Sequence, residues 1–100
     1  MTAAQLVEKG SGRWSLVGAL DFASVPGLWE ELSALIADCA KLSLSLRSVS
    51  AANSAGLVLL LEARDLARRS GCRLSFVDVP PALIDLASMS QAETLIAGRT

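Results

Sequence analysis

The chain has 100 residues, of which 52% are hydrophobic and only 4% are aromatic, and its formal net charge is −1. This length suffices for one small core, so we expect residues 1–100 to form a single domain whose core consists of Leu, Val, Ile and Ala. With nine basic and ten acidic residues, the chain has no excess of positive charge to attract a phosphate backbone, which argues against nucleic acid as a partner.

The first third of the chain predicts two strands followed by a helix. The segment 5–20, "QLVEKGSGRWSLVGAL", alternates polar and apolar residues around a "KGSG" turn, as in a β-hairpin. Ser24 then has the character of a helix cap, with Pro26 in the first turn of an amphipathic helix that reaches Cys39. Asp21 precedes this helix, and its expected role is in a turn or cap, with a functional role as the alternative.

The rest of the chain predicts two further strands, two helices and a last helical turn or two. Leu42, Leu44 and Leu46 alternate with polar residues, which is typical of a strand covered by helices on one face only. The segment 72–79 repeats this pattern, and 82–89 and 92–97 have helical character. With the helix that follows Asn53, the fold class is α/β. The order is β-β-α-β-α-β-α, with a four-stranded, mostly parallel sheet and helices mainly on one face.

No targeting or membrane-spanning segment is predicted. The N-terminus lacks an apolar signal segment, and no stretch approaches the roughly 20 apolar residues of a membrane span. Cys39 and Cys72 have no CxxC spacing and are expected to be reduced core thiols. These features predict a cytoplasmic protein whose membrane association, if it has one, comes through a partner and not through direct insertion.

The segment "SAANSAGLVLLL", residues 50–61, begins the most hydrophobic helix of the chain. At 100° per residue, Leu59 and Leu60 face the core, together with Gly56, whose missing side chain permits close approach to the sheet. A second stripe of the same helix faces away from the core; it begins at a serine, continues with apolar residues and ends in charged residues. Its members are Ser54, Leu57, Val58, Leu61, Arg64 and Arg68.

Two interpretations of this stripe are open. In the first, Ser54 or Asn53 only caps the helix, and a neighbouring loop covers the leucines. In the second, Ser54, Leu57, Val58 and Leu61 form a docking face for a protein, because exposed apolar clusters often mark interfaces. A helix N-terminus also tolerates negative charge, so a phosphate on Ser54 would be accommodated there.

The sequence predicts no enzyme, cofactor or metal site. It contains no histidine that could act as a base for Ser54, no glycine-rich phosphate loop and no cluster of carboxylates. The "GSG" in the first turn is a hairpin signal rather than a nucleotide-binding one.

Two short motifs resemble those of the STAS domain family. These are "GALD" at the end of the second strand and "NSAGL" at residues 53–57. The resemblance implies a STAS (SpoIIAA-like) fold and places Ser54 where anti-sigma factor antagonists carry a phosphorylated serine. It also implies supporting roles for Asp21, Asn53 and Gly56. The chain departs from the motif in having Asn53 in place of aspartate and Ala55 in place of a second hydroxyl residue.

Within this family the segments "LWEEL" and "LVLLLEARDLARRSG" are most similar to MlaB proteins, the STAS subunits of a bacterial phospholipid ABC transporter. This resemblance implies a cytoplasmic adaptor, peripheral to the inner membrane, that binds the transporter's ATPase through a surface containing Ser54. A charged rim of that surface would then consist of Arg64, Arg68 and Arg69. The alternative is an anti-sigma factor antagonist that is controlled by phosphorylation of Ser54.

Overall fold

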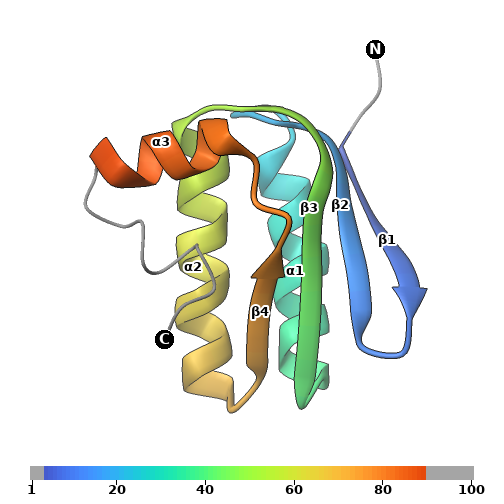
Figure 1. Cartoon of the computed structure of the whole chain (residues 1–100). Coiled ribbons are helices and arrows are strands. Elements are labelled where there is room, and N and C mark those ends of the chain that lie inside the picture. Colours follow the sequence, from blue (N-terminus) through green and yellow to red (C-terminus); the bar gives the residue numbers. More distant parts are fainter. Residues whose placement is uncertain (1–3, 90–100) are drawn as a thin grey trace.

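The structure, a computed structural model, describes residues 4–89 and consists of a four-stranded sheet and three helices (Figure 1). The order of elements along the chain is β-β-α-β-α-β-α, as predicted. The last helical turns expected at 92–97 lie outside the described residues. The elements are β1 Gln5–Gly10, β2 Arg13–Leu20, α1 Val25–Asp38, β3 Lys41–Ala52, α2 Ser54–Ser70, β4 Arg73–Val77 and α3 Pro81–Met89.

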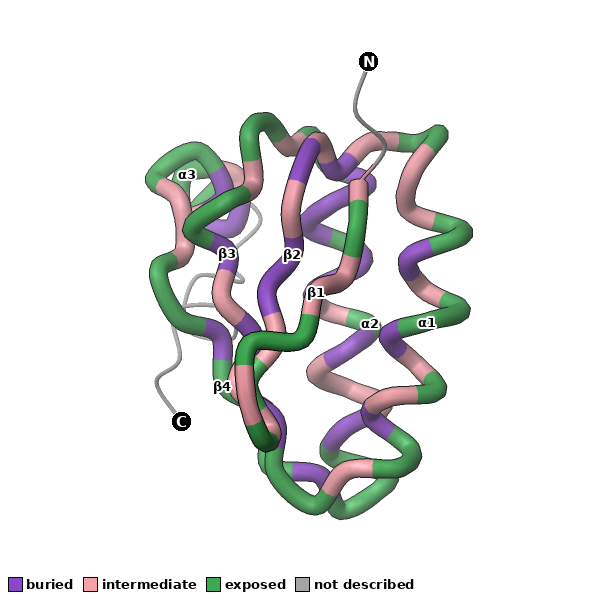
Figure 2. The backbone as a smooth tube through the Cα atoms, turned by 90° about the vertical axis from the view of Figure 1, so that its right-hand side faces the viewer, coloured by how far each residue is buried: buried purple, intermediate pink, exposed green. Residues whose placement is uncertain are grey.

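The sheet is mixed, with the spatial order β1-β2-β3-β4. β1 and β2 form an antiparallel hairpin whose turn contains Gly12 with φ of 70°, a backbone conformation that favours glycine. The pairs β2–β3 and β3–β4 are parallel and are connected through α1 and α2. Both connecting helices lie on the same side of the sheet (Figure 2). The prediction of a mostly parallel sheet with helices mainly on one face is therefore confirmed.

The core lies between the sheet and these helices. Leu42, Leu44 and Leu46 of β3 are fully buried, whereas the alternate residues Ser43 and Ser45 are partly exposed on the other face. This is the one-sided burial that the leucine alternation predicts. β3 extends beyond the predicted segment to Ala52, because its last residues pair with the end of β2.

The two cysteines are free thiols near the end of the molecule where α1 and α2 finish. Cys72 is buried and Cys39 is partly buried. Burial raises the pKa of the Cys72 thiol, and the nearby Cys39 raises it further. Cys72 is therefore a protonated core residue at neutral pH.

None of the helices in residues 4–89 combines the length and the apolar character that crossing a membrane requires.

Candidate functional site

The N-terminus of α2 is held against the end of β2. The backbone N–H of Asn53 donates to the carbonyl oxygen of Leu20 at 3.2 Å. A Cβ atom added to Gly56 would lie 2.9 Å from Leu20 Cβ, so a glycine is needed for this close approach. The predicted role of Gly56 in helix packing agrees with this geometry.

Asn53, and not Ser54, caps α2. The Asn53 side-chain Oδ1 accepts a hydrogen bond from the backbone N–H of Ala55 at 2.8 Å, which satisfies one of the free N–H groups of the first turn. Ser54 is the first helical residue and is exposed. Within residues 4–89 its hydroxyl has no hydrogen-bond partner, so this group is available to a partner molecule or a modifying enzyme.

Asp21 organises the turn between β2 and α1. One oxygen of its carboxylate, Oδ1, accepts hydrogen bonds from the backbone N–H groups of Ala23 at 3.0 Å and Ser24 at 2.9 Å. The Ser24 hydroxyl donates to the carbonyl oxygen of Ala19 at 2.8 Å and makes no capping bond to α1. Ser24 is the N-cap residue of α1, as predicted, but its hydroxyl makes no capping hydrogen bond because it closes the turn instead. The turn role expected for Asp21 is confirmed.

Two large apolar side chains are exposed beside Ser54. Phe22 follows Asp21 and is 72% exposed, and Val58, one turn into α2, is 53% exposed. A shallow, mainly apolar hollow of about 260 Å³ lies between the start of α1 and the start of α2. We call this surface the Phe22–Val58 patch. It is lined by Phe22, Val25, Pro26, Ser54, Ala55 and Val58.

Four members of this patch, Phe22, Val25, Pro26 and Ala55, were not among the predicted docking residues. Phe22 lies in a turn, where helical or strand periodicity does not apply, and Val25 and Pro26 were assigned only to the start of a helix. The sequence feature that could have identified Phe22 as a surface residue of interest is its position directly after the turn-forming Asp21, in a chain with only four aromatic residues.

Leu57 does not belong to an exposed stripe. It is only 5% exposed and lies in the same core cluster as Leu83 and Ala87 of α3. α3 packs against α2, across its first turns (Figure 1). The expectation that Leu57 is part of the docking surface is therefore wrong, because a second helix covers that flank of α2.

The remaining predicted residues lie farther along α2, away from Ser54. Leu61 and Arg64 are partly exposed and Arg68 is exposed. Arg68 is about 21 Å from Ser54 along the helix axis, at 1.5 Å per residue. Leu61, Arg64 and Arg68 border a separate hollow of about 370 Å³ with Asp65. The stripe predicted as one face is thus divided into two surfaces.

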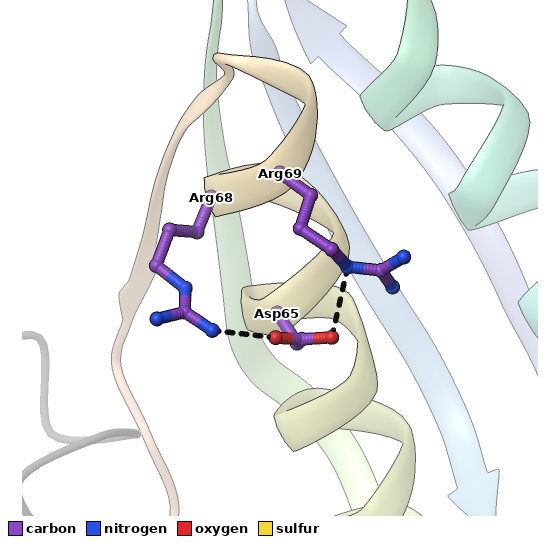
Figure 3. A network of polar contacts seen from close by, with 3 residues as sticks. All are labelled: Asp65, Arg68 and Arg69. Atoms are coloured by element: carbon purple, nitrogen blue, oxygen red, sulfur yellow. Dashed lines mark hydrogen bonds and ion pairs between the residues drawn. The ribbon is translucent and has the colours of Figure 1, made fainter.

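An ion-pair network occupies the charged end of α2 (Figure 3). Asp65 Oδ1 lies 2.8 Å from Arg68 Nη2, and Asp65 Oδ2 lies 3.0 Å from Arg69 Nε. The hydrogen bond from Arg68 holds the pKa of the Asp65 carboxyl below its ordinary value, and the charges of both arginines contribute in the same direction. Both arginines also stand in the last turn of α2, where the helix dipole favours positive charge.

The described part of the chain offers no metal site. Residues 4–89 contain no group of three or more His, Cys, Asp or Glu side chains that could hold a metal ion.

Comparison with known proteins gives one family and several similar folds. The sequence matches the family described as "Mlab, STAS domain" over residues 5–97. No curated protein matches the chain. The three solved structures described next are 18%, 21% and 17% identical to this chain, so they show a shared fold only. They include unphosphorylated SpoIIAA, an anti-sigma factor antagonist (18% identity, TM-score 0.67, covering 87% of this chain and 83% of that one). An anti-sigma factor antagonist from Mycobacterium paratuberculosis has 21% identity, a TM-score of 0.70 and coverage of 94% and 81%. Phosphorylated SpoIIAA from Bacillus has 17% identity, a TM-score of 0.70 and coverage of 94% and 88%.

Proposed function

Because this chain belongs to the STAS domain family of the Mlab type, we propose that it is a non-enzymatic adaptor that binds the ATPase subunit of a phospholipid ABC transporter. In this role it acts on the cytoplasmic side of the inner membrane, through its partner, in the transport that maintains outer-membrane lipid asymmetry. The observation that carries the proposal is the Phe22–Val58 patch, in which two exposed apolar side chains line the same hollow as Ser54.

The chemistry of this patch is that of a protein interface. Aromatic anchors with an apolar surround supply most of the binding energy of typical interfaces, and apolar area contributes about 25 cal/mol for each Å² removed from water. Phe22 and Val58 provide such area, and the small side chain of Ser54, which lines the same hollow, lets a partner approach the start of the helix closely. Asn53 and Asp21 support the patch indirectly, because they fix the two chain segments that carry it.

The surroundings of Ser54 favour binding over catalysis. A serine nucleophile needs a neighbouring base, and the sequence contains no histidine. No side chain among residues 4–89 hydrogen-bonds to the Ser54 hydroxyl, and the family's SpoIIAA-like domains are generally non-catalytic.

Co-purification tests the adaptor function. The ATPase subunit, carrying an affinity tag, is expressed with the wild-type chain, with Ser54→Arg, or with Ser88→Arg as a control at an exposed serine of α3. We expect Ser54→Arg to abolish co-purification, because it places a long charged side chain in the apolar hollow that Phe22 and Val58 line, and we expect the control to co-purify normally. Normal co-purification of Ser54→Arg contradicts the proposed surface.

A second candidate function is a phosphorylation switch, in which a kinase modifies Ser54 and so controls the docking of an anti-sigma factor. Two observations favour it: Ser54 is exposed at a helix N-terminus, and the fold resembles that of SpoIIAA, which has been solved in a phosphorylated form. Mass spectrometry of protein isolated from cells distinguishes the two functions. A stoichiometric phosphate on Ser54 supports the switch, and its consistent absence supports the adaptor.

A further inference from the structure

A second surface lies at the opposite end of α2 from the Phe22–Val58 patch. The end of α2 and the start of β4 meet at the bottom of the molecule in Figure 1. They surround a hollow of about 480 Å³ beside β4, which is an edge strand of the sheet. We call it the arginine groove. It is lined by Arg64, Ala67, Arg68, Cys72, Arg73 and Leu74.

The arginine groove combines an apolar floor with a cationic border. Ala67 and Cys72 are buried, and Leu74 is partly buried. The raised pKa of the Cys72 thiol reflects a poorly hydrated environment at this floor. Arg64 and Arg68 also line the neighbouring hollow that Leu61 borders.

The positive charges around the groove are only partly neutralised. Asp65 pairs with Arg68 and Arg69. Arg64 and Arg73 have no carboxylate within 4 Å among residues 4–89.

We propose that the arginine groove binds an anionic amphiphile with a phosphate head group, such as an acidic phospholipid. The guanidinium group of Arg64, with those of Arg68 and Arg73, holds the phosphate, since arginine presents several N–H donors to phosphate oxygens. The apolar portion of the ligand lies on Ala67 and Leu74.

The features of the groove favour this ligand over two others. A nucleic acid strand would need aromatic side chains on which bases stack, and none lines the groove. A small inorganic anion would use the arginines but leave the apolar floor exposed to water. Only a ligand that has both an acidic head and an apolar part uses both features.

This site is independent of the proposed docking surface. The arginine groove and the Phe22–Val58 patch share no lining residue, and Ser54 and Arg68 are about 21 Å apart along α2. The ligand proposal therefore stands or fails separately from the adaptor function.

The test measures binding of three probes to the full chain by isothermal titration calorimetry. The probes are dihexanoyl phosphatidylglycerol, dihexanoyl phosphatidylcholine and glycerol 3-phosphate, used as dissolved monomers. We expect the phosphatidylglycerol to bind about tenfold more tightly than each of the other two, because it alone has both a net negative head and acyl chains. Equal binding of glycerol 3-phosphate would overturn the amphiphile proposal, and so would the absence of phosphatidylglycerol binding.

Variants localise the site. Arg64→Gln and Arg73→Gln each remove one cation from the groove, and Arg47→Gln removes one from an exposed position on β3 as the matched control. We expect each groove variant to weaken phosphatidylglycerol binding by about tenfold, and the control to leave it unchanged. Circular dichroism verifies that the variants are folded. Equal weakening by Arg47→Gln would show nonspecific charge attraction and overturn the proposal.

Discussion

The backbone N–H of Asn53 donates to the carbonyl oxygen of Leu20 at 3.2 Å, so α2 begins directly beside the end of β2. This contact joins two segments that are far apart in the sequence. Phe22 lies two residues after Leu20, and Ser54 directly follows Asn53. The hydrogen bond therefore aligns the two chain segments that build the Phe22–Val58 patch.

Gly56→Ala tests how closely α2 approaches β2. The added Cβ would lie 2.9 Å from Leu20 Cβ and 3.3 Å from Ala52 Cβ, so the packing must shift. We expect the free energy of unfolding, measured in urea, to fall by about 1–3 kcal/mol. Gly27→Ala is the control in α1, where nothing lies within 4 Å, and it should be neutral or stabilise by up to about 1 kcal/mol. Equal effects of the two substitutions would contradict the close approach.

Asn53→Ala removes the cap of α2. Because the side-chain Oδ1 of Asn53 accepts a hydrogen bond from the backbone N–H of Ala55, we expect a loss of about 1 kcal/mol in the free energy of unfolding. Asn53→Asp retains an acceptor at the same position and should unfold at nearly the wild-type temperature. Thermal unfolding followed by circular dichroism compares the three proteins, and a wild-type curve for Asn53→Ala would show that the cap contributes nothing.

Leu57→Ala and Val58→Ala separate the core from the docking surface. Leu57 is buried against the core that includes α3, so its truncation should lower the free energy of unfolding by about 2–5 kcal/mol. Val58 is exposed, and its truncation should change stability by less than about 0.5 kcal/mol while weakening binding of the ATPase subunit. Urea unfolding and titration calorimetry measure the two effects. The assignment of Leu57 to the core is contradicted if both variants have the same stability.

The pKa of Asp65, followed by NMR, tests the ion-pair network. The hydrogen bond from Arg68 is the main cause that lowers this pKa in the folded chain. The folded state then binds fewer protons than the unfolded state, so the network stabilises above the ordinary carboxyl pKa and loses its effect as pH falls through the lowered value. The contribution is small because the side chain is solvent-exposed. Arg68→Gln should raise the Asp65 pKa more than Arg69→Gln does, and the reverse order would contradict the assignment.

Most of the fold could be predicted because its signals are local. The alternation of Leu42, Leu44 and Leu46 is sufficient to predict a sheet covered on one face. The error at Leu57 arose because a helical wheel describes one helix, whereas α3 covers part of α2 only through tertiary packing. The role of the Ser24 hydroxyl was missed for a similar reason, since its acceptor at Ala19 belongs to β2. Phe22 lies in a turn, where side-chain direction follows from hydrogen bonds that periodicity does not encode.

The most direct test of the adaptor function measures the affinity of the purified ATPase subunit for two variants, each of which has a different exposed valine replaced by glutamate. Val58→Glu places a charge in the Phe22–Val58 patch, whereas Val77→Glu places it at another exposed valine, on β4. The proposed function predicts that Val58→Glu weakens binding by roughly tenfold or more and that Val77→Glu binds like the wild type. Wild-type affinity for Val58→Glu, or equal weakening by both substitutions, would contradict it.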